Sequence, residues 1–384
     1  MDVSVSVGGK FHMFNLAQQL ERKGILNQLI TSYPKFEVVK YGIPKNKINS
    51  VLVKEIIERG WNKLPNFFKN LYNPQYFISE VFDRSASFYL RKSDIVFGNS
   101  SMFLHVMRKA KDLGAITVVE RGSSHIKYQN KILKEEYERF GLKSFKLAHP
   151  KIIEKELNEY EEADYISIPS LFVKKTFIEY GVPELKIIHN PYGVDLSWFR
   201  QIPKEDDVFR IIFGGGLSLR KGTHYLLQAF AELNLPNAEL LLIGPESDEI
   251  IPFLKKYEGK YKRLDYQPIK ELYKYFSQGS VFVMPSLEEG LALVQPMAMA
   301  CGLPIIATTN TGAEDIVRDG IDGFIIPIRD IDAIKEKILF LYDNSDIRNN
   351  MAKSAKERIS ANFTWDDYGD RMIKNCEKIL KNRK

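Results

Sequence analysis

The chain has 384 residues, of which 44% are hydrophobic and 27% are charged, and this length exceeds what a single hydrophobic core usually fills. No apolar run is long enough for a transmembrane helix. The only two cysteines, Cys301 and Cys376, exclude a disulfide framework and a cysteine-based zinc site. We therefore expect a cytoplasmic protein of two domains.

Positive charge is concentrated in the first half of the chain. Residues 1–195 contain 29 Lys and Arg against 22 Asp and Glu, a net charge of +7, and the whole-chain value of +6 leaves −1 for the rest. Such an excess suits peripheral contact with an anionic membrane or with a phosphorylated acceptor. A solvated basic face explains it equally well.

Short β-branched runs alternate with amphipathic stretches, which is typical of βαβ units and parallel sheets. In the first half we predict strands at Val3–Val7, Asp94–Phe97, Ile116–Glu120 and Tyr165–Ile168, and helices at Phe11–Lys23 and Lys151–Ala163. The interval Leu196–Asp207 has no periodicity and is predicted to be a linker. Further strands are predicted at Phe209–Phe213, Glu239–Ile243, Ser280–Met284, Pro304–Ala307 and Gly323–Ile326. The predicted class is α/β, with two doubly wound domains.

The loop after the strand Phe209–Phe213 is rich in glycine and carries two cations. Its sequence, G-G-G-L-S-L-R-K-G-T, contains Gly215 and Gly216, then Arg220 and Lys221, and an amphipathic stretch follows. Glycines allow close approach of a ligand, and a helix N-terminus supplies unpaired N–H groups for an anion. The loop therefore suits a diphosphate, although a tight turn with two solvated cations is the alternative.

The loop after the strand Ser280–Met284 brings carboxylates to the same edge of the sheet. It reads P-S-L-E-E-G-L-A-L-V-Q and contains Glu288 and Glu289. Carboxylates there can accept hydrogen bonds from sugar hydroxyls, while helix capping is the simpler explanation. The residues that follow complete the predicted donor site: Gly290, Leu291, Ala292, Leu293, Val294 and Gln295.

The first half offers acceptor-side candidates in the loop R-G-S-S-H after the strand Ile116–Glu120. Arg121, Ser123, Ser124 and His125 could bind a phosphate or guide a proton there. His12 competes with them, although it falls in an amphipathic helix pattern where a packed or surface role is more common.

Two other segments carry residue types that are common in binding sites. Asp330 and Asp332 are spaced like a metal-binding pair but open a helix, so capping explains them and no metal site is expected. Residues 61–72, W-N-K-L-P-N-F-F-K-N-L-Y, mix aromatic rings with lysines, which is typical of a segment at a membrane interface. A loop that faces the core of the protein explains this composition equally well. No nucleic-acid motif is present.

The order G-G-L-S-x-R-K-G, then P-S-x-E-E-G with A-M-A-C-G-x-P, then T-G-A-E-D-I-V-x-D-G resembles the C-terminal domain of the family 4 glycosyltransferases (glycosyl transferases group 1). Weaker likenesses at Gly8–Gly9, Ile168–Ser170, Asn190–Asp195 and Phe363–Tyr368 extend the resemblance to the whole chain. It implies the GT-B fold, in which two Rossmann-like domains face each other across a cleft. Residues 1–200 would form the acceptor-side domain and residues 201–363 the nucleotide-sugar domain, while residues 364–384 would form a helix that crosses back.

The resemblance also implies roles for individual residues. Arg220 and Lys221 would neutralise the leaving diphosphate without a metal ion or other cofactor, Glu289 would contact the transferred sugar, and Gly9 would lie in the donor-binding loop of the first strand. His125 would be the active-site histidine of the first domain and would position the acceptor or the sugar, while the leaving diphosphate takes the proton of the acceptor.

Two positions depart from the family pattern. Met297 stands eight residues after Glu289, where the family typically has a second glutamate for the ribose, so ribose binding would be arranged differently, for example through Gln295. Gly216 stands where many members have an arginine, and Arg220 is a candidate substitute.

The expected function is transfer of a sugar, with retention of anomeric configuration, from a nucleotide-diphosphate sugar to a glycan or glycolipid. Cell-surface polysaccharide or lipopolysaccharide synthesis would be the setting. A non-catalytic nucleotide-sugar binder and a nucleotide-sugar epimerase of the same fold are the alternatives. The sequence leaves open which sugar, nucleotide and acceptor are used, and the oligomeric state.

Overall fold

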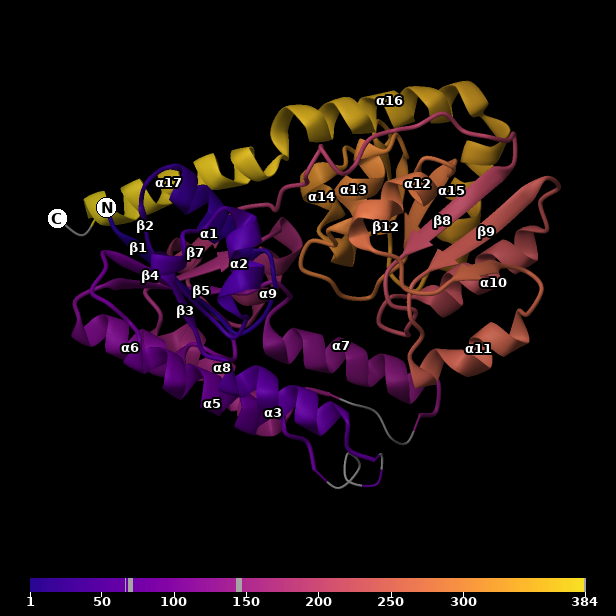
Figure 1. Cartoon of the computed structure of the whole chain (residues 1–384). Coiled ribbons are helices and arrows are strands. Elements are labelled where there is room, and N and C mark those ends of the chain that lie inside the picture. Colours follow the sequence, from indigo (N-terminus) through magenta and orange to yellow (C-terminus); the bar gives the residue numbers. More distant parts are fainter. Residues whose placement is uncertain (66, 68–71, 143–146, 383–384) are drawn as a thin grey trace.

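A computed structural model describes residues 1–65, 67, 72–142 and 147–382, and it contains two parallel β-sheets (Figure 1). The first sheet has the strand order β3-β2-β1-β4-β5-β6-β7. Its strands are β1 Val3–Val7, β2 Leu26–Thr31, β3 Ile48–Ser50, β4 Ile95–Asn99, β5 Ile116–Glu120, β6 Tyr165–Ile168 and β7 Ile187–His189. The strand order reverses direction between β1 and β4, where doubly wound sheets bind ligands.

Helices cover both faces of the first sheet, because its strands are apolar on both sides. Val5 and Phe97 belong to one hydrophobic layer, while Val96 and Val119 belong to the other. Alternate residues of a strand point to opposite faces, which explains this division. The helices are α1 Met13–Arg22, α2 Lys35–Val38, α3 Val53–Asn62, α5 Gln75–Phe88, α6 Leu104–Asp112, α7 Ile126–Arg139, α8 Pro150–Glu162 and α9 Leu171–Glu179.

The second sheet has the order β10-β9-β8-β11-β12-β13 and the same doubly wound arrangement. Its strands are β8 Phe209–Gly214, β9 Ala238–Ile243, β10 Lys262–Leu264, β11 Val281–Met284, β12 Ile305–Thr308 and β13 Gly323–Ile326. Its helices are α10 Thr223–Leu233, α11 Ile251–Lys256, α12 Leu272–Phe276, α13 Val294–Ala300, α14 Ala313–Ile316, α15 Ile331–Asp343 and α16 Ser345–Asn362.

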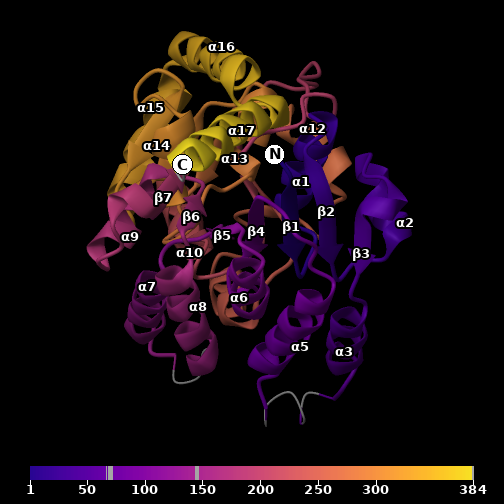
Figure 2. The ribbon, with the colours of Figure 1, turned by 90° about the vertical axis from the view of Figure 1, so that its left-hand side faces the viewer.

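The last helix, α17 (Trp365–Asn382), leaves the second domain and packs on α1 of the first (Figures 1 and 2). Asp366 accepts a hydrogen bond of 2.9 Å from Gln19 on α1. A Cβ added at Gly369 would lie 2.6 Å from the Cβ of Gln19, so the two helices can approach this closely because residue 369 has no side chain.

The chain passes between the domains twice, and the two passages lie side by side. The Val194 N–H donates to the Phe363 carbonyl at 2.9 Å, and Val194 forms a parallel bridge with Thr364. A Cβ at Gly193 would lie 2.4 Å from the Thr364 carbonyl oxygen, which excludes a larger residue at this contact.

The predicted α/β class with two doubly wound sheets is confirmed. The prediction missed β2, β3, β7 and β10, and several strand ends differ by one or two residues.

Asp330 caps α15 by accepting from the Ala333 N–H at 2.8 Å, as its position predicted. A helix that spans a membrane needs a longer apolar stretch than any helix of the described residues contains. Residues 66 and 68–71 of the predicted interfacial segment lie outside the described part.

Candidate functional site

The glycine-rich loop after β8 lies at the carboxyl end of the second sheet and brings two cations there. Gly215 has φ +136° and Gly222, just before α10, has φ +67°, which are conformations that favour glycine. A Cβ on Gly222 would lie 2.0 Å from the Pro285 carbonyl oxygen. Gly222 therefore allows the segment with Arg220 and Lys221 to approach the loop that follows β11.

Arg220, Lys221 and Glu289 form one charged group at this edge. Lys221 Nζ lies 2.6 Å and Arg220 Nη1 3.1 Å from Glu289 Oε1. Burial disfavours the Glu289 carboxylate, but the two cations lower its pKa below the usual value, so the group is ionised. Arg220 and Lys221 keep a partly exposed surface. The sequence prediction thus named three residues that the fold brings together.

Glu288 is fully buried and joins the two domains. Its Oε1 accepts from the N–H and the hydroxyl of Ser124 at 2.9 and 2.7 Å, and its Oε2 accepts from Gln129 Nε2 at 2.9 Å. Arg220 Nη1 donates to the Glu288 main-chain carbonyl at 2.9 Å. In this structure Glu288 and Ser124 bind each other, so their polar atoms serve the domain interface.

The segment after Glu289 packs directly on the first domain. The Gly290 carbonyl accepts from Ser170 Oγ at 2.6 Å, and a Cβ on Gly290 would lie 2.0 Å from the Gly122 carbonyl oxygen. Glycine at position 290 therefore permits the contact between loops from the carboxyl ends of both sheets.

The rest of this segment is mostly buried. Leu291 and Ala292 are buried, whereas Leu293 and Val294 at the start of α13 are partly exposed. The first N–H groups of a helix lack intrahelical partners and can bind an anion. Gln295 is fully buried and donates to the Thr311 carbonyl at 3.0 Å, so in this conformation it is not exposed to a ribose.

Met297 lies on α13 in the hydrophobic core and is 7% exposed. Its thioether is a weak acceptor and cannot replace a carboxylate that holds two hydroxyls. At the position where the family pattern has a glutamate, this chain therefore has a methionine that packs in the core.

Arg121 is buried and fully engaged. It pairs with Glu156 at 2.9 Å and donates to Gln129 Oε1 at 2.9 Å and to the Ser124 carbonyl at 3.1 Å. Burial opposes its charge, but Glu156 and neighbouring groups raise its pKa above the usual value. Arg121 therefore shapes the loop, and the half-buried Ser123 between Arg121 and Ser124 is the more accessible side chain.

His125 is a helix cap surrounded by aromatic rings. Its Nδ1 accepts from the Lys127 N–H at 3.3 Å at the start of α7, and its ring stacks on Tyr180 at 4.6 Å. Burial, followed by the charges of Arg121 and Lys127, lowers its pKa to about 4. His125 is 2% exposed, so in this structure its side chain caps α7 and packs among aromatic rings.

His12 lies instead at the carboxyl end of the first sheet, next to the buried Gly9 loop. Its Nε2 is 3.0 Å from Glu120 Oε1, and its ring lies 4.2 Å from that of Tyr192. The sequence placed Glu120 beside the candidate loop of the first domain but gave it no role, and it did not single out Tyr192. The only available signals were the position of Glu120 at a strand end and the presence of Tyr192 in the segment Asn190–Asp195.

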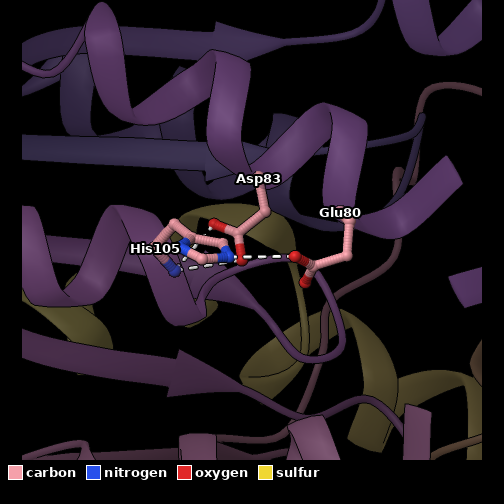
Figure 3. A group of neighbouring side chains, drawn as sticks. All are labelled: Glu80, Asp83 and His105. Carbon is pink, nitrogen blue, oxygen red and sulfur yellow. Dashed lines mark hydrogen bonds and ion pairs between the residues drawn. The ribbon is translucent and has the colours of Figure 1, made fainter. Parts of the chain in front are cut away.

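One group of side chains has the composition of a metal site: Glu80 and Asp83 on α5 with His105 on α6 (Figure 3). However, Lys155 Nζ lies 2.7 Å from a carboxylate oxygen of each acid. Although burial opposes ionisation, hydrogen bonds from Lys155 and His105 lower the pKa of Glu80 to about 2. The lysine balances the acids, so the group is explained as an ion-pair network.

Comparisons with known proteins support the resemblance. Residues 195–358 match the family described as Glycosyl transferases group 1. A capsular polysaccharide biosynthesis glycosyltransferase of Staphylococcus aureus is 32% identical over 176 residues, which are 42% of this chain and 45% of that protein. An uncharacterised glycosyltransferase of Methanocaldococcus jannaschii is 25% identical over 58% of this chain and 62% of its own length. The matches thus span less than two thirds of these relatives.

Solved structures match over nearly the whole chain. Sucrose-phosphate synthase from Thermosynechococcus elongatus has a TM-score of 0.72 at 17% identity, with both chains fully covered. HepE from Anabaena, solved in complex with UDP-glucose, has a TM-score of 0.70 at 13% identity, covering 98% of this chain and 100% of that one. These likenesses show that the whole chain has the GT-B fold, and residues 195–358 match the group 1 glycosyl transferases.

Proposed function

We propose that the protein is a retaining, metal-independent glycosyltransferase of family 4 that uses a nucleotide-diphosphate sugar. The observation that carries this proposal is the convergence of Arg220, Lys221 and Glu289 at the carboxyl end of the second sheet. Open α/β sheets bind ligands at that edge, and two partly exposed cations can hold a diphosphate. The UDP-glucose complex of the structural neighbour HepE supports a donor of this class.

The charged group has a distinct task in the reaction. When the diphosphate binds, Arg220 and Lys221 exchange part of their contact with Glu289 for phosphate oxygens. They then stabilise the negative charge that develops on the leaving group, which usually contributes most to catalysis. Glu289, freed from these cations, accepts hydrogen bonds from the sugar hydroxyls. Since the cations belong to the protein, the reaction needs no divalent ion.

The proposed acceptor is a glycan or glycolipid of the cell surface, because two relatives are named for capsular polysaccharide or colanic acid synthesis. We place the enzyme in the cytoplasm, in peripheral contact with the inner face of the membrane. On α3, Ile56 is 69% exposed and Val53 is 40% exposed, whereas Lys54 is buried. Exposed apolar side chains beside a buried lysine are the opposite of the usual pattern in water, and they suit a helix whose outer face contacts a membrane. Co-sedimentation with anionic vesicles at low salt tests it, and no binding would refute the membrane contact.

Donor binding tests the site directly. Calorimetry with UDP-glucose and other nucleotide sugars should give binding to the wild type and at least a hundredfold weaker binding to Arg220→Ala/Lys221→Ala, because two charge-assisted contacts at about 1.5–3 kcal/mol each are lost. The control is Lys353→Ala/Lys356→Ala, which removes two exposed lysines of α16. Equal binding by both double variants and the wild type would contradict the proposed donor site.

A non-catalytic nucleotide-sugar binder is the second candidate, favoured by the position of Met297 in the core. It predicts tight donor binding without transfer to any acceptor and without hydrolysis. Release of free nucleotide diphosphate from a bound donor would exclude it.

A further inference from the structure

Two aromatic rings are exposed at the carboxyl end of the first sheet. Phe11 is 56% exposed in the loop that follows β1, and Phe36 is 65% exposed at the start of α2, which follows β2. Because β1 and β2 are neighbouring parallel strands, both loops leave the sheet at the same edge. Phe11 and Phe36 therefore form an aromatic surface that a ligand can cover.

This aromatic surface packs on well-ordered parts of the fold. A Cβ added at Gly9 would lie 2.5 Å from Phe11 Cε2 and 3.0 Å from its Cζ, so the ring of Phe11 lies directly over the Gly9 backbone. The buried Phe14 on α1 makes edge contacts with the rings of Tyr33 and Tyr41, at 5.9 and 5.2 Å between ring centres. A ligand that covers the surface therefore meets side chains that are already supported from below, which lowers the entropic cost of binding.

The same edge carries positive charge. Residues 32–47 contain four lysines and one glutamate. The loop after β1 adds Lys10, whose Nζ lies 5.6 Å from the centre of the Tyr41 ring. Lys10, Lys35 and Lys45 are exposed, and no acid in the described part of the chain forms an ion pair with them. Cations without an acidic partner can bind the phosphate or carboxylate groups of a ligand.

The aromatic surface continues toward the proposed donor loop through His12. A Cβ on Gly122 would be 3.5 Å from His12 Cε1, and a Cβ on Gly290 in the donor loop would be 2.0 Å from the Gly122 carbonyl oxygen. Beside His12, the buried Glu120 Oε2 and the buried Tyr192 hydroxyl have no hydrogen-bond partner among the described residues. Buried polar atoms are rarely left without a partner, and the hydroxyls of a sugar can supply one.

We propose that this edge is the acceptor site and that the acceptor is a glycan with phosphate or carboxylate groups. The inference rests on the proposed transferase function and adds the class of the acceptor. Sugar rings of the acceptor stack their C–H faces on Phe11 and Phe36. Its anionic groups bind Lys10 and Lys35, and its hydroxyls bind the polar atoms beside His12.

These residues bind and orient the acceptor without taking a proton. As the acceptor oxygen bonds to the anomeric carbon, the bond from that carbon to the diphosphate breaks, and its electron pair stays with the diphosphate. The leaving diphosphate accepts the proton of the attacking hydroxyl on the same face of the sugar. The acceptor site therefore selects the glycan and leaves the retaining reaction as proposed.

Calorimetry with sugar oligomers tests the aromatic surface, with saturating UDP present to occupy the donor site. The anionic probe pentagalacturonate should bind the wild type more tightly than the neutral maltopentaose. Phe11→Ala/Phe36→Ala should weaken the binding of pentagalacturonate by about tenfold or more, because covering half of each ring contributes at least that factor. The matched control is Phe88→Ala/Tyr89→Ala, which removes rings that are 86% and 52% exposed just before β4, at the amino end of the same sheet.

The cations have a separate readout. Lys10→Gln/Lys35→Gln should weaken the binding of pentagalacturonate and reduce its dependence on salt, but should leave the binding of maltopentaose unchanged, because salt screens only the charged contacts. Arg91→Gln/Lys92→Gln is the matched control, since it removes two exposed cations at the amino end of the sheet.

Three results would overturn the proposal. Pentagalacturonate might bind no more tightly than maltopentaose, or the Phe11→Ala/Phe36→Ala variant might bind it as well as the ring control does. The third is binding of the wild type to anionic vesicles, lost in both test variants, without binding of pentagalacturonate, which would identify the surface as a lipid contact.

Donor binding separates this inference from the proposed function. If the wild type binds a nucleotide sugar but not pentagalacturonate, only the acceptor class fails. If the wild type binds no nucleotide sugar, the proposed function itself fails, and the inference fails with it.

Discussion

Glu136 on α7 joins the first domain to the second, and we expect its replacement by glutamine to weaken that connection. Its side chain is 1% exposed, and it accepts from Tyr225 OH at 2.6 Å, Arg329 Nε at 2.7 Å and His224 Nε2 at 3.0 Å. All three partners belong to the second domain. Helix α7 reaches across to that domain in Figure 1.

The magnitude follows from the charge that is removed. Glutamine keeps the shape and one acceptor oxygen but leaves the Arg329 guanidinium without its carboxylate. A hydrogen bond to a charged group contributes about 1.5–3 kcal/mol, and removal of one partner of a buried ion pair costs about 3–5 kcal/mol. We expect Glu136→Gln to lower the free energy of unfolding by about 2–3 kcal/mol and Glu136→Ala by about 3–5 kcal/mol.

The stabilisation should also depend on pH. Burial disfavours the Glu136 carboxylate, but hydrogen bonds from its three partners lower its pKa below the model-peptide value near 4.5. The unfolded state therefore binds the proton more readily. The contribution of Glu136 is complete above that value and is lost as the pH falls through the lower pKa of the folded state.

Urea unfolding followed by tryptophan fluorescence measures the loss, and small-angle scattering measures separation of the domains. The matched control is Glu135→Gln, since Glu135 is the neighbour on α7, is 46% exposed and touches Arg329 only at 3.4 Å. If the two variants differed by less than about 0.5 kcal/mol, the typical effect of surface substitutions, the buried network would not hold the domains together.

Two other predictions concern the contact between the domains and the environment of His125. Gly290→Ala should destabilise the protein by about 1–3 kcal/mol, as overpacking does, because its Cβ would lie 2.0 Å from the Gly122 carbonyl oxygen. In thermal unfolding, the melting temperature of Gly290→Ala should lie well below that of the control Gly60→Ala, whose added Cβ meets no atom within 4 Å. The pKa of His125 is lowered to about 4, so the wild type should lose about 3 kcal/mol between pH 6.5 and 4, where only the unfolded state binds the proton. His125→Phe should remove this part of the pH dependence, and an unchanged profile in urea titrations would contradict the assignment.

Most of the fold could be predicted from the sequence because buried parallel strands are continuous apolar runs. Val3–Val7 and Ile116–Glu120 were predicted with the observed ends. The strands β3, β7 and β10 were missed because each has only three residues, which are too few to show the apolar pattern of a strand. The six-residue β2 was missed because Asn27 and Gln28 interrupt its apolar run. The fold satisfies both side chains, since Asn27 donates to the Lys92 carbonyl and Gln28 accepts from Asn49.

The sequence predicts that some candidate site residues meet, but it does not predict the surroundings of others, and the reason is physical. Arg220, Lys221 and Glu289 lie in loops at one edge of one sheet, so their meeting follows from topology. The pairing of His12 with Glu120 joins residues 108 positions apart, and no local pattern encodes it. Conversely, His125 follows a strand end as a catalytic residue would, but aromatic neighbours distant in sequence enclose its ring.

The two adjacent passages between the domains restrict how the molecule can move. The hydrogen bond from Val194 to Phe363 joins the two crossings, so a movement of one domain relative to the other has to carry both crossings together or break this bond. A sliding displacement of one domain past the other would break this tie, whereas rotation about the line through the two crossings preserves it. If one domain rotates relative to the other, the rotation that keeps this bond is described by a single angle. The loops at Gly122 and Gly290, which are in contact in this structure, would limit that rotation in one direction.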